Sequence, residues 1–375
     1  MGNNTVEAIR AFERGEIIVV MDDNGRENEG DLIIAAVHCT SVKMAFIVRY
    51  TSGIVCAAIP HEEAKRLHLA PMVSDNDSLH STTFTVTVDY RYGTTTGISA
   101  DDRTLTVRNL ANPHAVPTDF VRPGHIFPLI AREGGVLTRS GHTEAAVDLC
   151  RLAKLPPVGV LCELINDDGT VMRGSQVSAF AKRNNLHQVT VANLIAYRQH
   201  KEQLIEHLAE ISVKTMIGFV VAHIYQLPWE SIQHIALIIG DIHSGENIPV
   251  HLYYENVFND IFWKAHHLDQ MLKWIKEEHK RGVLIYLREG SICVTKKEGS
   301  KNTCTHKNQE NHAEAVIREQ QWRKIGLGAQ ILKHLGLHSI VLLASKERSY
   351  VGLERFGIRI ARTEVCHFSR TTPTK

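Results

Sequence analysis

A short acidic segment between two apolar runs constrains this chain more than any other feature. Residues 22–31 (DDNGRENEGD) carry five carboxylates, one arginine and two glycines. The flanking runs, 17–21 and 32–37, have the length and apolar content of buried strands, and Asn-Gly is a hairpin signal. Such close carboxylates repel one another unless a cation lies among them, and carboxylate oxygens suit Mg²⁺ or Mn²⁺. A solvated, charged turn is the alternative interpretation.

The bulk composition narrows the classes of protein. The chain has 375 residues, 43% of them hydrophobic, and a net charge of +1. This length accommodates two domains, and so small a net charge gives no field that would recruit nucleic acid or an acidic membrane. No apolar segment approaches bilayer length. Seven scattered cysteines without a CxxC pair indicate neither a disulfide framework nor a zinc ribbon, so we expect a cytoplasmic protein.

Strands and helices are mixed in the first half without a regular βαβ period, which predicts an α+β domain over residues 1–205. Helices are expected at 4–14, 144–154, 175–186 and 189–210, and a strand at 158–164. The domain boundary is predicted near 200–212, and a second, α/β domain over 212–375. Its expected elements are strands at 235–239, 250–254 and 283–286, a helix at 268–280, a mobile insertion at 294–312, and a helix–strand–helix pattern at 329–335, 340–343 and 351–356.

A second polar cluster, residues 139–143 (RSGHT), opens directly into a predicted helix. A helix N-terminus presents free N–H groups and a positive dipole end, which favour phosphate. Thr143 could equally be an ordinary N-cap with Glu144 in the first turn, but this alternative does not explain Arg139 and His142. Because both clusters combine a metal-ligand type with an anion-binding type, together they favour a metal-dependent site for a phosphorylated substrate.

At this point the chain resembles a known family, 3,4-dihydroxy-2-butanone 4-phosphate synthase of riboflavin biosynthesis. The resemblance covers about residues 4–200. Five segments carry it: 22–36 (DDNGRENEGDLIIAA), 52–56 (SGIVC), 94–103 (TTTGISADDR), 122–129 (RPGHIFPL) and 139–149 (RSGHTEAAVDL). The resemblance implies an α+β homodimer that converts D-ribulose 5-phosphate to the four-carbon phosphate and formate with two Mg²⁺ (or Mn²⁺) ions per active site.

The resemblance also implies roles for individual residues. Glu27 and His142 are expected as metal ligands, and His125 and Glu163 as catalytic residues. The expected substrate-binding set is Arg26, Glu27, Asp31, Arg139, Ser140, Gly141, His142, Thr143 and Glu163. Further residues in the matching motifs are Cys56, Glu29, Thr96 and Asp102, with less defined roles. Alternatively, His125 is a turn histidine, Glu163 a surface carboxylate and Cys56 a plain buried thiol.

The reaction needs these residue types. Ribulose 5-phosphate must lose a proton next to its ketone, and a metal that chelates neighbouring oxygens stabilises the resulting negative charge. A carboxylate or an imidazole then moves protons for enolisation, dehydration and tautomerisation. A skeletal rearrangement finally expels one carbon as formate.

The second domain is similar to GTP cyclohydrolase II in a degenerate form. The similar segments are Val250-His251, Arg288-Glu289-Gly290, 325–332 and 351–358. The family's three zinc-binding cysteines are replaced at Tyr254 and 265–267, its Asp-x-Arg element reads Gln321-Trp322-Arg323, and its Thr-Asn-Asn-Pro segment is residues 344–347. Without zinc no water is activated, so a non-catalytic domain is expected.

Two alternatives are kept for the second domain. The chain could be a bifunctional enzyme that also retains GTP cyclohydrolase II activity. An improvised zinc site could also form from Cys293, Cys304, His266, His267 and His306, although their spacing matches no standard pattern.

Overall fold

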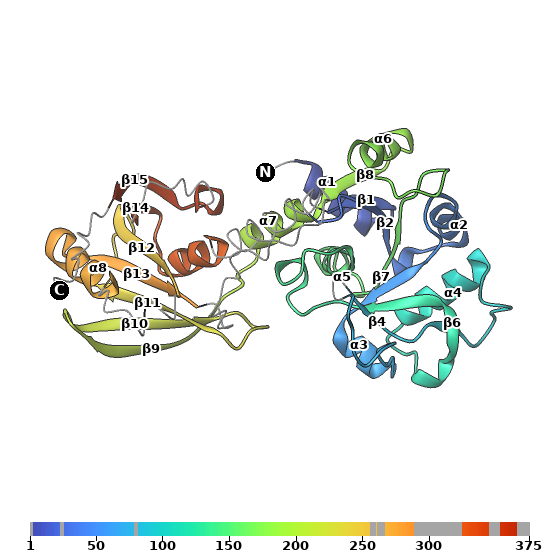
Figure 1. Cartoon of the computed structure of the whole chain (residues 1–375), viewed down its shortest axis with the longest axis horizontal. Helices are drawn as coiled ribbons and strands as arrows, with labels where there is room; N and C mark the ends of the chain where they lie inside the picture. Colours follow the sequence, from blue (N-terminus) through green and yellow to red (C-terminus); the bar gives the residue numbers. More distant parts are fainter. Residues whose placement is uncertain are drawn as a thin grey trace, which may run out of the picture. The chain divides into compact units, whose positions relative to one another are not determined.

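The structure, a computed structural model, describes residues 3–22, 26–78, 82–255, 260, 267–288, 325–344 and 353–365. These residues form two compact units that divide between Arg198 and Gln199. Each unit is built on its own sheet (Figure 1). No described helix combines the length and apolarity needed to cross a membrane.

A mixed, eight-stranded sheet forms the first unit. Its strands follow the order β4-β6-β3-β7-β2-β1-β8, and β5 pairs with β6. Most neighbours are antiparallel, but β1 pairs with β8, and β3 with β6, in parallel. The strands are β1 (Ile18–Met21), β2 (Gly30–Ala35), β3 (Cys56–Ile59), β4 (Thr83–Phe84), β5 (Val88–Tyr90), β6 (Phe120–Ile130), β7 (Gly159–Glu163) and β8 (His187–Thr190).

Both faces of this sheet are buried. Along β2, Leu32 and Ile34 belong to one apolar core, whereas Ile33 and Ala35 belong to a second core. Alternate side chains of a strand point to opposite faces, so one core lies on each face of the sheet. This explains why the run after the acidic segment is continuously apolar rather than alternating.

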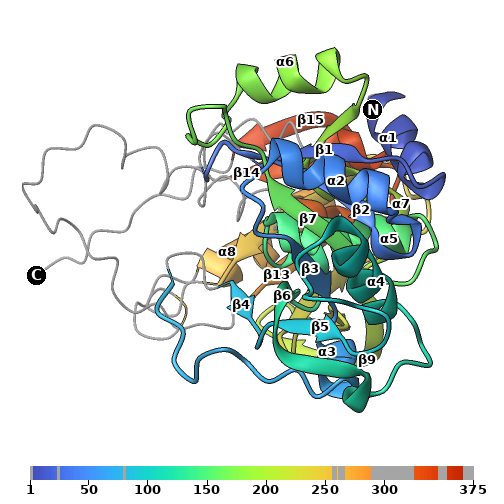
Figure 2. The same cartoon turned by 90° about the vertical axis from the view of Figure 1, so that its right-hand side faces the viewer.

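Helices cover the two faces. In Figure 1, α2 and α5 lie on opposite sides of β2 and β7, and in Figure 2 α2 and α4 lie in front of the strands. The first core receives Met44, Val107 and Val177 from α2 (Ser41–Tyr50), α4 (Ala100–Leu110) and α6 (Ser175–Arg183). The second receives Phe12, Leu149 and Leu194 from α1 (Asn3–Glu13), α5 (His142–Leu152) and α7 (Val191–Lys201). A short helix, α3 (His61–Arg66), follows β3. The α+β prediction is therefore confirmed.

The second unit contains a seven-stranded sheet in the order β15-β14-β12-β13-β11-β10-β9. The four strands from β15 to β13 are parallel, and β11, β10 and β9 continue the sheet antiparallel. These strands are β9 (Glu206–Thr215), β10 (Gly218–Gln226), β11 (Gln233–Ile239), β12 (Ile248–Tyr254), β13 (Gly282–Leu287), β14 (Ser339–Ala344) and β15 (Arg359–Val365). A helix over residues 325–334 and α8 (His267–Trp274) accompany them, in agreement with the α/β prediction.

Two predicted helices were wrong in part. The helix expected at 189–210 ends at Lys201, and β9 begins at Glu206. Residues 206–215 pair with β10 along their length, so tertiary pairing overrides the local charge pattern. In the segment predicted as a helix at 351–356, the described residues form a 3₁₀ turn (Leu353–Phe356), and the strand β15 that follows was missed. The expected insertion at 294–312 lies outside the described residues.

Candidate active site

The acidic segment is folded around one buried carboxylate. Oδ1 of Asp22 accepts a hydrogen bond from the backbone N–H of Glu29 at 2.8 Å. Its Oδ2 accepts from the backbone N–H of Glu27 at 3.1 Å and from Nη1 of Arg26 at 2.9 Å. The same Arg26 nitrogen lies 2.6 Å from Oε2 of Glu27. Asp22 therefore closes the loop and brings Glu27 back over the sheet, a role that the sequence analysis did not assign to it.

Sheet register places three of the predicted residues at one end of the sheet. Asp31 pairs with Glu163 across β2 and β7. His125 lies two residues before Phe127, which pairs with Cys56 of β3, and Cys56 in turn pairs with Leu161 of β7. Phe127 and Leu161 are therefore level in the sheet. His125 and Glu163 each lie two residues from that level in the same direction, so His125 is level with Glu163 and with its partner Asp31. Because side chains two residues apart share a face, all three lie on the face that α5 covers.

His142 is the first residue of α5 and faces this acidic end of the sheet. It is buried, and its Nδ1 lies 3.7 Å from Oδ1 of Asp31. Asp22, Glu27 and His142 each offer one ligand atom, and these atoms lie within 4.8 Å of one another. Among the described residues, no hydrogen-bond partner reaches the buried Nε2 of His142 or Oδ1 of Asp31. This donor set, with its unpartnered buried atoms, fits a divalent cation.

The electrostatics of the site favour the same cation. Burial raises the pKa of Glu27 despite the adjacent Arg26, and the neighbouring carboxylates raise it further. Burial, and next the Glu163 carboxylate, raise the pKa of Asp31 well above its ordinary range. Burial lowers the pKa of His142 to about 4, so its ring is neutral and offers a lone pair. A bound divalent cation would offset the cost of holding these carboxylates ionised together.

The turn before α5 is built for close packing around Arg139. Its Nη1 donates to Oε2 of the buried Glu144 at 2.5 Å, and its Nη2 donates to Oγ1 of Thr82 at 2.7 Å. A Cβ on Gly141 would lie 2.2 Å from Arg139 Nη1, so a larger residue there would displace the guanidinium from its present position. The helix starts at His142 with Gly141 as its N-cap, two residues before the predicted start. Thr143 lies inside the first turn, which excludes its alternative role as the N-cap.

A buried ion pair, which the sequence analysis missed, clamps the same turn. Nη1 of Arg198 on α7 lies 2.8 Å from Oδ2 of Asp148 on α5 and 2.7 Å from the carbonyl oxygen of Gly134. The Asp148 carboxylate also accepts from the backbone N–H of Val136 at 2.8 Å. The segment 134–139 is thereby tied to two helices. The matching motif contained Asp148, but no local signal connects it to an arginine fifty residues later.

His125 belongs to a carboxylate–imidazole pair. Its Nδ1 lies 2.7 Å from Oδ2 of Asp89, and its backbone N–H donates to Oδ1 of the same residue at 2.8 Å. Gly97 covers this pair, since a Cβ there would lie 2.0 Å from Asp89 Oδ2 and 2.6 Å from His125 Nδ1. The Gly97 loop is held by Asp102, which accepts from the N–H groups of Thr95 and Gly97. His125 is thus an oriented imidazole, and Asp89 is the partner that the sequence analysis missed.

Two further residues of the matching motifs have structural contacts. The Cys56 thiol is buried, donates to the carbonyl oxygen of Ile54 at 3.6 Å, and has its pKa raised well above the ordinary range by burial. Such a thiol is a poor nucleophile, which favours the plain buried reading. Glu29 accepts from Nη2 of Arg173 at 2.7 Å, and this pair joins the acidic segment to the turn before α6.

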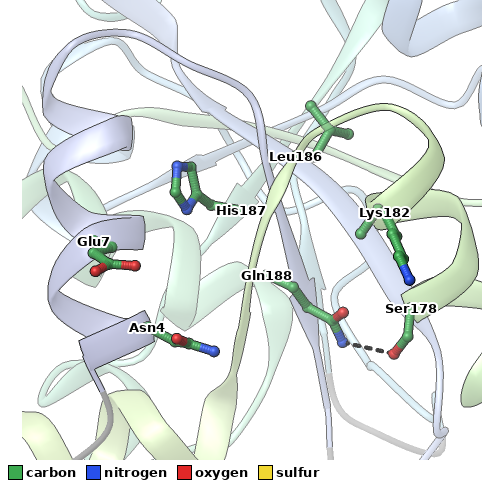
Figure 3. A pocket seen from close by; sticks show the side chains of 8 residues that line it. Asn4, Glu7, Ser178, Lys182, Leu186, His187 and Gln188 are labelled. Carbon is green, nitrogen blue, oxygen red and sulfur yellow. Dashed lines mark hydrogen bonds between the residues drawn. The ribbon is translucent and has the colours of Figure 1, made fainter.

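A cavity of about 280 Å³ lies between α1, β8 and α6 (Figure 3). Asn4, Glu7, Ser178, Lys182 and Gln188 are among its lining residues. None of the site residues predicted from the sequence lines it. This cavity is therefore distinct from the acidic end of the sheet.

Comparisons with known proteins identify the families of both units. The family model described as 3,4-dihydroxy-2-butanone 4-phosphate synthase matches residues 6–197, and the model described as GTP cyclohydrolase II matches residues 192–365. The chain is 43% identical over 370 residues to a protein named bifunctional riboflavin biosynthesis protein RIBA 1, chloroplastic, of Arabidopsis thaliana. That alignment covers 94% of this chain and 67% of the relative.

Two solved structures are similar as well. A two-domain 3,4-dihydroxy-2-butanone 4-phosphate synthase from A. baumannii matches with a TM-score of 0.78 and 33% identity, over 96% of this chain and 99% of that one. A 3,4-dihydroxy-2-butanone 4-phosphate synthase in complex with two magnesium ions matches with a TM-score of 0.51 and 45% identity. This second match covers 52% of this chain and 97% of that one.

The buried carboxylate of Asp31 should cost the metal-free protein stability. Its pKa is higher in the folded protein than the ordinary 3.8, so the folded state binds more protons and its stability falls as pH rises through that window. In EDTA at pH 8, Asp31→Asn should therefore raise Tm by at least about 3 °C, which corresponds to about 1 kcal/mol. Thermal unfolding followed by circular dichroism measures this shift.

Asp168→Asn is the matched control. Its carboxylate is exposed, and hydrogen bonds from the Thr170 side chain and backbone lower its pKa, so this variant should not gain stability. An Asp31→Asn variant that unfolds at a lower temperature than the parent in EDTA would contradict the electrostatic account of the site.

Proposed function

Because the chain belongs to the 3,4-dihydroxy-2-butanone 4-phosphate synthase family, we propose that its first unit converts D-ribulose 5-phosphate to 3,4-dihydroxy-2-butanone 4-phosphate and formate in riboflavin biosynthesis. The observation that carries this proposal is the set of buried Asp22, half-buried Glu27 and buried His142 beside Asp31 and Glu163. Such a set combines a cation site with carboxylates available for proton transfer.

We propose that Glu27 and His142 hold the cation, with Asp22 within reach of it. Two Mg²⁺ ions per active site are proposed, with Mn²⁺ as a substitute, and the solved relative with two magnesium ions supports this stoichiometry. When bound, the metal supplies electrostatic stabilisation for negative charge that develops on the substrate oxygens. We assign Arg26 and Asp31 to contact with the sugar next to the metal.

Proton transfer is assigned to Glu163 and His125. Burial, and next the Glu29 carboxylate, raise the pKa of Glu163, which makes it a stronger base than an ordinary glutamate. Asp89 holds the His125 ring through Nδ1, so Nε2 of His125 is the nitrogen left to face the substrate. With the two groups level on one face of the sheet, enolisation and dehydration can use a different residue for each proton.

The phosphate group is assigned to the N-terminus of α5. The backbone N–H groups of Ser140 and Thr143 and the Thr143 hydroxyl belong to the positive end of the helix dipole, and we assign the phosphate to them. The N–H of Gly141 donates to the carbonyl oxygen of Arg139 at 2.9 Å, so Gly141 would contact the phosphate only if that bond opens. Arg139 adds a positive charge beside them, although Glu144 and Thr82 already anchor two of its nitrogens. The phosphate would then lie at one end of the substrate and the reacting carbons near Glu27 and His142.

We further propose the biological context of the enzyme. Residues 1–205 are the synthase domain, residues 212–375 the cyclohydrolase-like domain, and the active form is a homodimer. Four described cysteines, Cys39, Cys56, Cys150 and Cys162, are free and buried, which supports a reducing, cytoplasmic compartment.

The second unit is proposed to be non-catalytic. Tyr254 stands at the end of β12 where the related family has a zinc-binding cysteine. The other replaced positions, 265–266, 321–323 and 345–347, lie outside the described residues, whereas His267 begins α8 and Ala344 ends β14. The name of the A. baumannii protein mentions only the synthase activity, which supports a two-domain synthase. The plant relative is named bifunctional, and this favours the alternative in which GTP cyclohydrolase II activity is retained.

Metal dependence tests the proposed site directly. EDTA should abolish formate release from ribulose 5-phosphate, and added Mg²⁺ should restore it. Glu27→Gln keeps the shape of the side chain but removes its charge, so it should reduce turnover on the order of 100-fold or more. The unfolding temperature in EDTA should not fall, because the raised pKa of Glu27 shows that its negative charge is unfavourable in the folded protein. Full turnover without metal would contradict the proposal.

The phosphate assignment predicts a change in KM. Thr143→Ala removes one hydroxyl donor to a charged group, so KM for ribulose 5-phosphate should rise on the order of tenfold. Because Gly141 rather than Thr143 is the N-cap, the stability of the variant should stay close to that of the parent. An unchanged KM would leave Thr143 as an ordinary residue of the first helical turn.

GTP turnover separates the two candidate functions of the second unit. The full chain should release formate from ribulose 5-phosphate but not from GTP, with Zn²⁺ and Mg²⁺ present. The positions of the zinc-binding cysteines and of the catalytic acid are replaced, so the second unit lacks the residues that would activate water to attack GTP. Formate released from GTP in a zinc-dependent reaction would instead establish the bifunctional enzyme.

A further inference from the structure

A group of potential metal ligands lies in the second unit on β9 and β10, the edge of its sheet (Figure 1). His207, Glu210 and His223 each offer one ligand atom, and the three atoms lie within 4.8 Å of one another. We call these residues the histidine cluster. It is separate from the acidic end of the first sheet and contains none of the positions where the related cyclohydrolases have zinc-binding cysteines.

A β-bulge brings the cluster together. His207 and Glu210 are three residues apart on β9, so a regular strand would point them to opposite faces. The pairing of β9 with β10 shifts here, because Ile224 pairs with Ala209 while Tyr225 pairs with His207. Leu208 is the extra residue, and its insertion returns His207 to the face of Glu210. Bulges that re-aim a side chain in this way are common beside functional sites.

Two of the three distances between ligand atoms in the cluster match a tetrahedral site, and the third is within 4.8 Å. Nε2 of His207 lies 3.2 Å from Nδ1 of His223, and that Nδ1 lies 3.5 Å from Oε1 of Glu210. Ligand atoms about 2.0–2.1 Å from a Zn²⁺ ion in tetrahedral geometry are separated by about 3.3 Å. The cluster needs little movement to accept such an ion. In its absence, the same atoms can form only a histidine–histidine hydrogen bond and a weak ion pair.

Neighbouring rings fix the orientation of these ligands. The His207 ring centroid lies 5.1 Å from that of His223, 5.2 Å from that of Tyr225 and 5.2 Å from that of His334. Tyr225 is buried, and its hydroxyl lies 3.0 Å from Nδ1 of His334 on the helix 325–334. Glu210, by contrast, is exposed, with 58% of its side chain accessible, so the cluster opens to solvent on one side.

We propose that His207, Glu210 and His223 bind one Zn²⁺ ion in the second unit. Two imidazoles and one carboxylate are a ligand set that suits zinc, and three protein ligands leave a fourth position for water or another ligand. Bound there, the ion cross-links β9 to β10 at the bulge. This metal site is new to the second unit and does not depend on the synthase activity proposed for the first.

Zinc binding by the full-length chain tests the proposal. Every protein in this test, the parent included, carries Glu27→Gln, which weakens the metal site proposed for the first unit. Bound metal is removed with EDTA, and each protein is then titrated with ZnCl₂ in competition with a chromophoric chelator. The parent should bind one equivalent in the second unit. His223→Ala and His207→Ala should each weaken zinc binding on the order of 100-fold. Losing a direct ligand should cost at least as much affinity as losing a hydrogen-bond partner of a ligand. His243→Ala, an exposed histidine of the same unit, is the matched control and should bind like the parent.

Two further measurements keep the test decisive. Co²⁺ bound in place of Zn²⁺ should give a tetrahedral spectrum without a thiolate charge-transfer band, which separates this site from any cysteine ligands. Glu210→Gln alters only an exposed side chain, so it reports on binding even if a histidine variant fails to fold, and it should weaken binding about tenfold. Three outcomes would each overturn the proposal. The parent could bind no zinc, Glu210→Gln and the folded histidine variants could bind zinc as tightly as the parent, or the Co²⁺ spectrum could show a thiolate band.

Discussion

Repulsion among crowded carboxylates, of which Asp31 is buried, at one end of the first sheet is the constraint on which the site depends. Asp31 is buried and pairs across the sheet with Glu163, and the loop closed by Asp22 adds Glu27 to the same region. A protein keeps such an arrangement at the expense of stability when function requires it. The neutral, buried His142 completes a donor set that fits a cation, and a bound cation would relieve the repulsion.

The sheet that carries this charge is rigid because both of its faces are buried. Alternate residues of β2 enter two separate cores, so the strand can neither slip nor tilt without exposing apolar surface. On one face, α5 packs with its N-terminus at the acidic end, and the Asp148–Arg198 pair ties the preceding turn to α7. The proposed metal ligands, proton-transfer groups and phosphate donors therefore come from separate elements that hold one another in place.

The two units use their sheets differently. In the first unit, the proposed site residues gather where strands end beside a helix N-terminus. In the second, the polar cluster of His207, Glu210 and His223 lies on an edge hairpin, where a bulge rather than a strand end gathers the ligands. A domain that shares the fold of an enzyme family can thus carry a different set of potential metal ligands from those of its relatives. Its fold alone does not settle its chemistry.

The sequence by itself determined the acidic hairpin, the helix after residues 139–143, the α+β and α/β classes and the family, because these depend on local patterns and long motifs. Tertiary structure alone decided the rest. Asp89 became the partner of His125, and Arg198 that of Asp148, through contacts between residues 36 and 50 positions apart. Strand β9 replaced a predicted helix because β10 offered it a partner, and the bulge at Leu208 aligned His207 with Glu210. Hydrogen-bond pairing and register are properties of the assembled sheet, so no window of sequence contains them.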